Sequence, residues 1–137
     1  YEIFSGSAEY VTKLKPMDGA DAYMLDLGDV FESAAVYLDG KYLGTVFKKP
    51  YAVMLTAEQA QKGGELKVVV SNSMENRISW MDRNDIPWRI FYNANIQSHS
   101  WDSRGSDGLF SAAGWSVQPS GLAGPVTVTP LSVRVVD

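Results

Sequence analysis

This sequence of 137 residues contains no cysteine and a single histidine, His99. The missing thiols exclude disulfide bonds and thiolate zinc sites, and one histidine leaves ordinary zinc or copper centres short of ligands. Stability must therefore come from buried side chains, and 45% apolar residues are enough for one core in a chain of this length. We expect a single domain over residues 1–137.

Long apolar runs and basic tracts are also absent. No apolar stretch approaches the ~20 residues of a membrane-spanning helix, and no charged start followed by an apolar core marks a signal peptide. The net charge is −4, and the lysines and arginines are scattered. We expect no membrane span and no nucleic-acid partner, because neutralised phosphates supply most of the affinity for nucleic acid.

Alternation of apolar and polar residues with a period of two dominates the rest of the sequence. It predicts short strands with these inward-facing sets: Tyr23, Leu25 and Leu27; Ala34, Val36 and Leu38; Leu43, Thr45 and Phe47; Tyr51, Val53 and Leu55; Leu66, Val68 and Val70. Because each apolar face must be covered by another sheet, the pattern predicts an all-β, antiparallel sandwich.

Two short motifs predict how strands are connected. Asp39-Gly40 lies between alternating apolar residues and predicts a two-residue type I′ hairpin turn, because both positions need positive φ. Thr56 and Gln59 have the spacing of a capping box for a helical turn over Ala57 to Lys62, which Gly63-Gly64 ends.

The alternation fades between Ser73 and Pro119, a stretch too long for a plain loop, and we expect a strand there around Trp88 to Tyr92. Aromatic rings that can stack on a pyranose stand among amides, carboxylates and guanidinium groups that can hydrogen-bond its hydroxyls. The predicted carbohydrate-binding residues are Arg77, Trp80, Asp82, Trp88, Tyr92, His99, Trp101 and Trp115. The open alternative is that the aromatic residues only pack this segment onto the sandwich.

The segment between Ser73 and Pro119 gives less evidence for catalysis than for sugar binding. Hydrolysis of a glycosidic bond needs two carboxylates roughly 5–10 Å apart, and no spacing identifies a pair among the candidates. His99 lies between two serines, but there is no Gly-x-Ser-x-Gly elbow. We predict no catalytic residue, which makes a free-standing glycosidase the least favoured alternative.

Five motifs resemble a known family in their order and spacing. They are Ser5-Gly6-Ser7-Ala8-Glu9-Tyr10, Asp26-Leu27-Gly28, Ala34 to Gly44 followed by Pro50-Tyr51, Val68-Val69-Val70-Ser71-Asn72, and Ser120-Gly121-Leu122-Ala123-Gly124-Pro125-Val126. Together they resemble the galactose-binding-like β-sandwich attached to glycoside hydrolases, notably the sugar-binding domain of family 2 and the C-terminal sandwich of the family 106 α-L-rhamnosidases. The likeness covers nearly the whole chain.

The resemblance implies a galactose-binding-domain-like jelly roll that is a non-catalytic carbohydrate-binding or accessory domain of a larger glycoside hydrolase of the α-L-rhamnosidase type. Its partners would be a plant or microbial glycan and the catalytic domain of the same parent chain, in a secreted or periplasmic setting. The alternative role is a structural domain that packs on a catalytic barrel and lends a loop to the active-site rim.

A structural calcium ion is the cofactor that the resemblance raises, because sandwiches of this kind often hold one in loop carboxylates and carbonyls. The candidate loops, Asp102 to Gly108 and Asp82 to Ile86, match a calcium-binding loop poorly. No other cofactor is expected.

Overall fold

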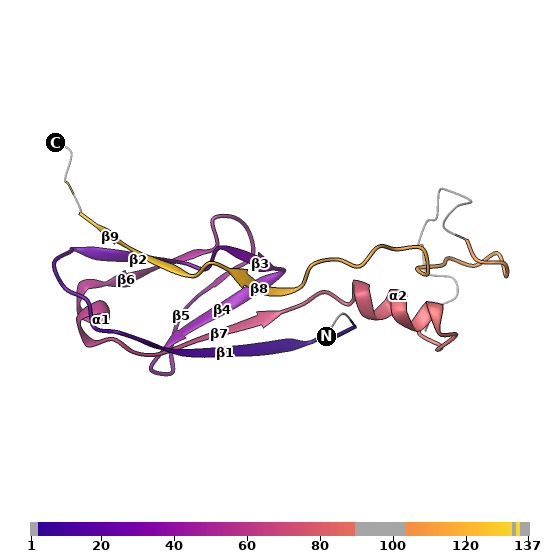
Figure 1. The fold of residues 1–137 in the computed structure, drawn as a ribbon, viewed down its shortest axis with the longest axis horizontal. Coiled ribbons are helices and arrows are strands. Elements are labelled where there is room, and N and C mark those ends of the chain that lie inside the picture. Colours follow the sequence, from indigo (N-terminus) through magenta and orange to yellow (C-terminus); the bar gives the residue numbers. More distant parts are fainter. Residues whose placement is uncertain (1–2, 90–103, 133, 135–137) are drawn as a thin grey trace. The chain divides into compact units, whose positions relative to one another are not determined.

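The computed structural model describes residues 3–89, 104–132 and 134, which are drawn in colour in Figure 1. The chain divides into two compact units. Unit 1 comprises Tyr1–Ser5 and Ser73–Pro119, and unit 2 comprises Gly6–Asn72 and Ser120–Asp137. The main part of unit 1 thus coincides with the segment in which the strand alternation fades, and the assignment of residues 1–137 to one domain stays a prediction.

Unit 2 consists of antiparallel strands in layers (Figure 1). One sheet has the order β1 (Ser7–Leu14), β7 (Gly64–Ser71), β4 (Ser33–Leu38), β5 (Lys41–Val46). A second has the order β6 (Ala52–Thr56), β2 (Ala22–Asp26), β9 (Thr127–Leu131). β3 (Asp29–Phe31) pairs with β8 (Gly121–Gly124). The prediction of an all-β, antiparallel sandwich is confirmed.

The core of unit 2 is built from alternate residues of β2, β4, β6 and β7. Most predicted inward faces are confirmed, since these residues are buried: Tyr23, Leu25, Leu27, Ala34, Val36, Leu38, Val53, Leu55, Leu66, Val68 and Val70. Full burial of a valine or leucine side chain stabilises the fold by about 1.5–3 kcal/mol. Unit 2 therefore has the apolar core that the sequence predicts.

The face predicted for Leu43 to Phe47 is wrong beyond Leu43. The pairing of β5 with β4 shifts next to Val36, so that Leu43 is an extra residue in the ladder. An extra residue moves the following side chains to the opposite face of the sheet. Val46 therefore packs against the core, whereas Phe47 is 71% exposed.

Both predicted connections are confirmed. Asp39 and Gly40 have φ values of 48° and 76°, as a type I′ turn requires. At α1 (Ala57–Lys62), the Gln59 N–H donates to Thr56 Oγ1 at 3.2 Å and the Thr56 N–H donates to Gln59 Oε1 at 2.8 Å. The two bonds form the capping box and fix where the chain leaves β6.

The motif near the end of the chain brings two backbone segments into close approach. Gly28 has a φ of +68°, and a Cβ atom added there would lie 2.3 Å from the carbonyl carbon of Gly124. Glycine is therefore required sterically as well as conformationally at this position. Pro125 directly follows β8, and β9 begins at Thr127.

Unit 1 contains a helix, α2 (Glu75–Arg83), that the sequence pattern did not predict. Among the described residues, four side chains attach α2 to the rest of unit 1: Arg83 and, at a spacing of three, Asn76, Ser79 and Asp82. They form a polar stripe, whereas amphipathic helices are recognised by an apolar one. Of the predicted strand at 88–92, residues 88 and 89 lie in no strand and residues 90–92 lie outside the described residues.

In the described part of the chain, no helix is long and apolar enough to cross a membrane.

Candidate functional site

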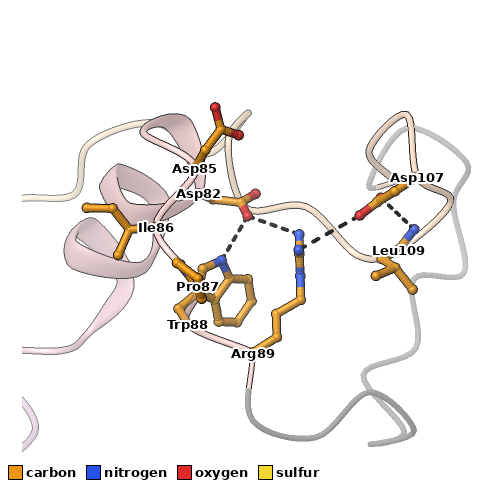
Figure 2. A pocket seen from close by; sticks show the side chains of 8 residues that line it. All are labelled: Asp82, Asp85, Ile86, Pro87, Trp88, Arg89, Asp107 and Leu109. Atoms are coloured by element: carbon orange, nitrogen blue, oxygen red, sulfur yellow. Dashed lines mark hydrogen bonds and ion pairs between the residues drawn. The ribbon is translucent and has the colours of Figure 1, made fainter.

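Asp82, in the last turn of α2, is the centre of the hydrogen-bond network of unit 1. Its side chain is only 8% exposed. Oδ1 accepts from Trp88 Nε1 at 2.8 Å and from Arg89 Nη2 at 3.0 Å (Figure 2). Oδ2 accepts from three further donors, which are the Ser111 hydroxyl at 2.6 Å and the N–H groups of Ala112 at 2.8 Å and Ala113 at 3.1 Å. Asp82 therefore joins α2 to two later segments of the unit.

The surroundings of Asp82 favour its ionised form. Burial is the largest influence, and alone it would raise the pKa of the carboxyl group. Hydrogen bonds from Ser111, Trp88 and Ala112, together with the positive charge of Arg89, outweigh burial and lower the pKa below its usual value. The carboxylate is therefore charged near neutral pH.

Arg89 is held in place from several sides. Its Nε donates to the Phe110 carbonyl at 3.0 Å, and its guanidinium carbon lies 5.1 Å from the centre of the Trp88 ring. Nη1 lies 4.0 Å from Oδ2 of Asp107, the limit of an ion pair. Because only 26% of the side chain is exposed, these contacts fix the direction of its remaining N–H donors.

Three of the described aromatic residues of unit 1, Trp88, Phe110 and Trp115, pack on one another edge to face. The rings of Trp88 and Phe110 are 6.3 Å apart at 81°, and those of Phe110 and Trp115 are 5.8 Å apart at 62°. Such pairs contribute about 0.5–1.5 kcal/mol beyond the area they bury. Trp88 and Trp115 thus have a packing role within unit 1, whereas the packing of aromatic residues onto the sandwich stays an untested alternative.

Other side chains of α2 bind the backbone of the later segment. Asn76 donates to the Gln118 carbonyl and accepts from its N–H, both at 2.8 Å. Arg83 Nε donates to the Ala113 carbonyl at 2.8 Å, and its Nη2 donates to the Trp115 carbonyl. Together with Asp82, these residues attach the chain between 112 and 118 to the helix.

A hollow of about 330 Å³ opens beside this network (Figure 2). It is lined by Asp82, Asp85, Ile86, Pro87, Trp88, Arg89, Asp107 and Leu109. Asp85 and Asp107 are exposed, while Trp88 and Arg89 are partly buried. The volume lies at the lower end of the range of about 300–1,000 Å³ for small-molecule sites. An indole ring, a guanidinium group and two exposed carboxylates can stack on and hydrogen-bond a ligand rich in hydroxyl groups.

The structure brings together only some of the predicted site residues. Asp82 and Trp88 line the hollow, whereas Arg77, Trp80 and Trp115 lie in unit 1 outside its lining. Tyr92, His99 and Trp101 lie outside the described residues.

The sequence reasoning missed Arg89 as a site residue, although it directly follows Trp88. Asp85 and Asp107 also line the hollow, although no spacing in the sequence singles them out.

Among the described residues, no group of three or more acidic or histidine side chains could hold a metal ion. The described parts of the two candidate calcium loops therefore contain no cluster of metal ligands. In the loop that begins at Asp82, both carboxylate oxygens accept hydrogen bonds from protein donors. Residues 102 and 103 of the other loop lie outside the described residues.

Comparison with known proteins relates the chain to glycoside hydrolases. No protein-family model matches it. Its fold is similar to part of a rhamnosidase from Novosphingobium sp. PP1Y, with a TM-score of 0.59 and 27% identity, over 92% of this chain and 11% of that chain. Its sequence is 36% identical over 82 residues to a protein named "Putative beta-glucuronidase" from Formosa agariphila, covering 56% of this chain and 7% of that protein. The chain thus spans a small part of the length of the glycosidases it resembles.

Proposed function

We propose that this chain is a non-catalytic accessory domain of a larger glycoside hydrolase, and that the hollow beside Trp88 binds a sugar residue. The first part is supported by the likeness of nearly the whole chain to 11% of a rhamnosidase chain. The observation that carries the second part is the hollow itself, which places Trp88, Arg89 and Asp107 around one space. The ligand class is a plant or microbial glycan.

The gap between Arg89 and Asp107 suits a hydroxyl group. Nη1 and Oδ2 are 4.0 Å apart, too far for a good direct hydrogen bond. A sugar hydroxyl can accept from the guanidinium group and donate to the carboxylate at the same time. Because Arg89 is already fixed by Asp82 and Phe110, little side-chain entropy is lost when a ligand binds.

The state of Asp82 supports a non-catalytic role. A glycosidase needs a carboxylic acid whose raised pKa keeps a proton available for the leaving group. The pKa of Asp82 is lowered instead, and both of its oxygens accept hydrogen bonds within the unit. Asp82 therefore positions Trp88 and Arg89 and has no proton to transfer.

Isothermal titration calorimetry of this chain against a panel of oligosaccharides tests the sugar site. We expect weak binding that falls at least about tenfold in Asp107→Asn, since a single bond to a charged group contributes about 1.5–3 kcal/mol. This variant keeps an oxygen for the Leu109 N–H, which donates to Asp107 Oδ1 at 2.9 Å. Asp18→Asn is the matched control, because Asp18 is also exposed and accepts a local N–H, from Gly19.

Two results would overturn the sugar site. One is the absence of heat with every glycan at millimolar concentration, and the other is an equal loss of affinity in the Asp107 and Asp18 variants.

The second candidate is a structural domain that packs on a catalytic barrel and lends a loop to its active-site rim. It is favoured by the observation that Asp82, Arg83 and Asn76 use their polar groups to hold the segment 112–118 in place. In the parent enzyme, deleting this domain would then lower kcat or prevent folding of the catalytic part. A catalytic part that folds and turns over at full rate without it would contradict this role.

We propose α-L-rhamnosidase as the activity of the parent chain and a secreted or periplasmic location for it, supported by the rhamnosidase likeness. Assays of the parent on aryl α-L-rhamnosides and aryl β-glucuronides distinguish rhamnosidase activity from the β-glucuronidase activity in the name of the Formosa agariphila protein. Turnover of the glucuronide alone would refute the proposed activity, and recovery of the parent only in the cytosolic fraction would refute the location.

A further inference from the structure

Strand β1 is a long and exposed sheet edge. Among the described residues, β7 is the strand that pairs with it, in an uninterrupted register from Ser7 opposite Ser71 to Leu14 opposite Gly64. Val11 is 56% exposed and Tyr10 is 38% exposed. The strand contains neither proline nor a bulge, two of the devices that stop an edge from pairing with another chain, and its charged residues are one glutamate and one lysine.

The two faces of β1 have different surroundings. Tyr10 lies opposite the buried Val68 and so shares the core side of the sheet. Glu9, Val11 and Lys13 lie on the other face. On that face, Lys13 is opposite Glu65, and Glu9 forms a 3.7 Å ion pair with Lys67.

A hollow of about 440 Å³ lies over one end of the β1–β7 pair and is lined by Val11, Thr12 and Lys13 of β1 and by Gly64 and Glu65 of β7.

Antiparallel geometry restricts how β1 could pair with a copy of itself. In an antiparallel ladder, the N–H and C=O of one residue point to the same side, so only alternate residues of an edge strand offer hydrogen bonds outward. When two copies of the strand pair with each other, two opposing residues either both offer their hydrogen bonds to the other copy or both do not. The numbers of two opposing residues must therefore add to an even number.

One permitted register matches the charges of β1. When Val11 lies opposite Val11 of a second copy, Glu9 lies opposite Lys13 and Lys13 lies opposite Glu9. Opposite charges that face each other across two strands stabilise the pair, and like charges destabilise it. Glu9 would then lie between Lys67 of its own chain and Lys13 of the second copy, and Lys13 would lie between Glu65 and the second Glu9.

We propose that β1 is a self-complementary edge through which two copies of this chain form an antiparallel dimer, with Val11 on the two-fold axis. The contact joins two four-stranded sheets into one continuous sheet of eight strands. An apolar pair lies at its centre and an ion pair lies on each side. The dimer is independent of the sugar site, because the residues of β1 do not line the hollow beside Trp88.

Charge exchange tests the register. We expect sedimentation velocity to show dimers within a range from about 1 µM to about 1 mM, as suits a small interface. Glu9→Lys alone and Lys13→Glu alone each place two like-charged pairs at the contact, so each should weaken the dimer at least about tenfold. An equimolar mixture of the two variants should restore dimerisation, because both contacts of the mixed pair then bring a lysine of one copy opposite a glutamate of the other.

Lys41→Glu is the matched control, since Lys41 is an exposed lysine on β5, the other edge strand of the same sheet. It should leave dimerisation unchanged. A wild-type chain that stays monomeric throughout, a dimer insensitive to both charge variants, or a mixture that stays monomeric would each overturn the proposal.

Cross-linking provides a second test that does not depend on charge. The chain has no cysteine, so Val11→Cys introduces the only thiol. Opposing Cβ atoms in an antiparallel pair are about 4.5–5.5 Å apart, near the separation that a disulfide bond spans. Val11→Cys should therefore form a covalent dimer under mild oxidation, whereas Glu9→Cys, which would face Lys13, should not. Equal cross-linking of both variants, or none in Val11→Cys, would refute the register.

Discussion

At the scale of single residues, Asp82 requires a carboxylate rather than an amide. All five of its hydrogen-bond partners are donors: Trp88 and Arg89 at Oδ1, and Ser111, Ala112 and Ala113 at Oδ2. An asparagine side chain would turn an NH₂ group toward one of these sets, where at best the Ser111 hydroxyl can accept from it and the other donors lose their partner. The site therefore requires the two acceptor oxygens of aspartate, and a side chain of the same volume does not replace them.

Asp82→Asn should lower the stability of unit 1 by about 2–4 kcal/mol, because it leaves buried donors and the charge of Arg89 without their partner. All four tryptophans, at 80, 88, 101 and 115, belong to the segment of unit 1, so tryptophan fluorescence during urea unfolding reports on this unit. Asp85→Asn is the control, since Asp85 is exposed next to the same helix. Equal midpoints for the two variants would contradict the role of Asp82.

The lowered pKa of Asp82 also predicts a pH dependence. A carboxyl group whose pKa is lower in the folded state stabilises the fold fully above its unfolded pKa of about 3.9, and loses that contribution as the pH falls through the folded value. The gap in stability between the wild type and Asp82→Asn should therefore narrow below about pH 4. Urea titrations followed by tryptophan fluorescence at a series of pH values measure the gap. A gap that stays constant into the acid range would contradict the assignment.

At the scale of elements, Gly28 approaches Gly124 closely at the end of the β3–β8 pair, where Asp29 lies opposite Gly124. Gly28→Ala would combine a φ of +68° with a Cβ atom 2.3 Å from a backbone carbon, so we expect a loss of about 3 kcal/mol or more. Gly19→Ala is the matched control, because Gly19 also has a positive φ, +94°, but no atom lies within 4 Å of the added Cβ. It should cost about 1 kcal/mol. Far-ultraviolet circular dichroism measures both losses, and equal values would argue against the steric account.

The elements also show what could be predicted from the sequence. Strands β2, β4, β6 and β7 follow from period-2 alternation, and the turn at Asp39-Gly40 follows from the need for positive φ, whereas β1, β3 and β8 were not predicted as strands. The register shift at Leu43 has no such signal, since an extra residue leaves the alternation on either side intact.

The helix α2 could not be predicted from apolar periodicity, because its inner face carries Asn76, Ser79 and Asp82. The hollow beside Trp88 depends on this helix. The sequence therefore predicts the kinds of residue that line the hollow, but it does not predict which individual residues line it.

At the scale of the whole molecule, the two units differ in what stabilises them. Unit 2 has an apolar core, whereas only Ser79 and Ala112 are buried among the described residues of unit 1. Ordering a residue costs about 1–2 kcal/mol, which hydrogen bonds with a net value of about 1 kcal/mol do not offset on their own. Unit 1 should therefore depend on a folded unit 2, as one domain over residues 1–137 would require.

This dependence predicts the order of two unfolding transitions in urea. Tryptophan fluorescence, which follows unit 1, should change at or before the circular dichroism signal of the strands, and Gly28→Ala should shift both signals. Asp82→Asn should shift the fluorescence more than the dichroism. A fluorescence transition that persists after the strands have unfolded would show that unit 1 is stable alone and would contradict the single-domain prediction.

The attachment of the chain between 112 and 118 to α2 depends little on which side chains that segment carries. Asn76, Asp82 and Arg83 hold the chain between 112 and 118 largely through its backbone N–H and C=O groups, which every non-proline residue possesses. The exposed positions 114, 116 and 117 contribute no side chain to that attachment. We therefore expect these positions to accept other side chains while the attachment is kept, so that loops with new ligands can be selected here.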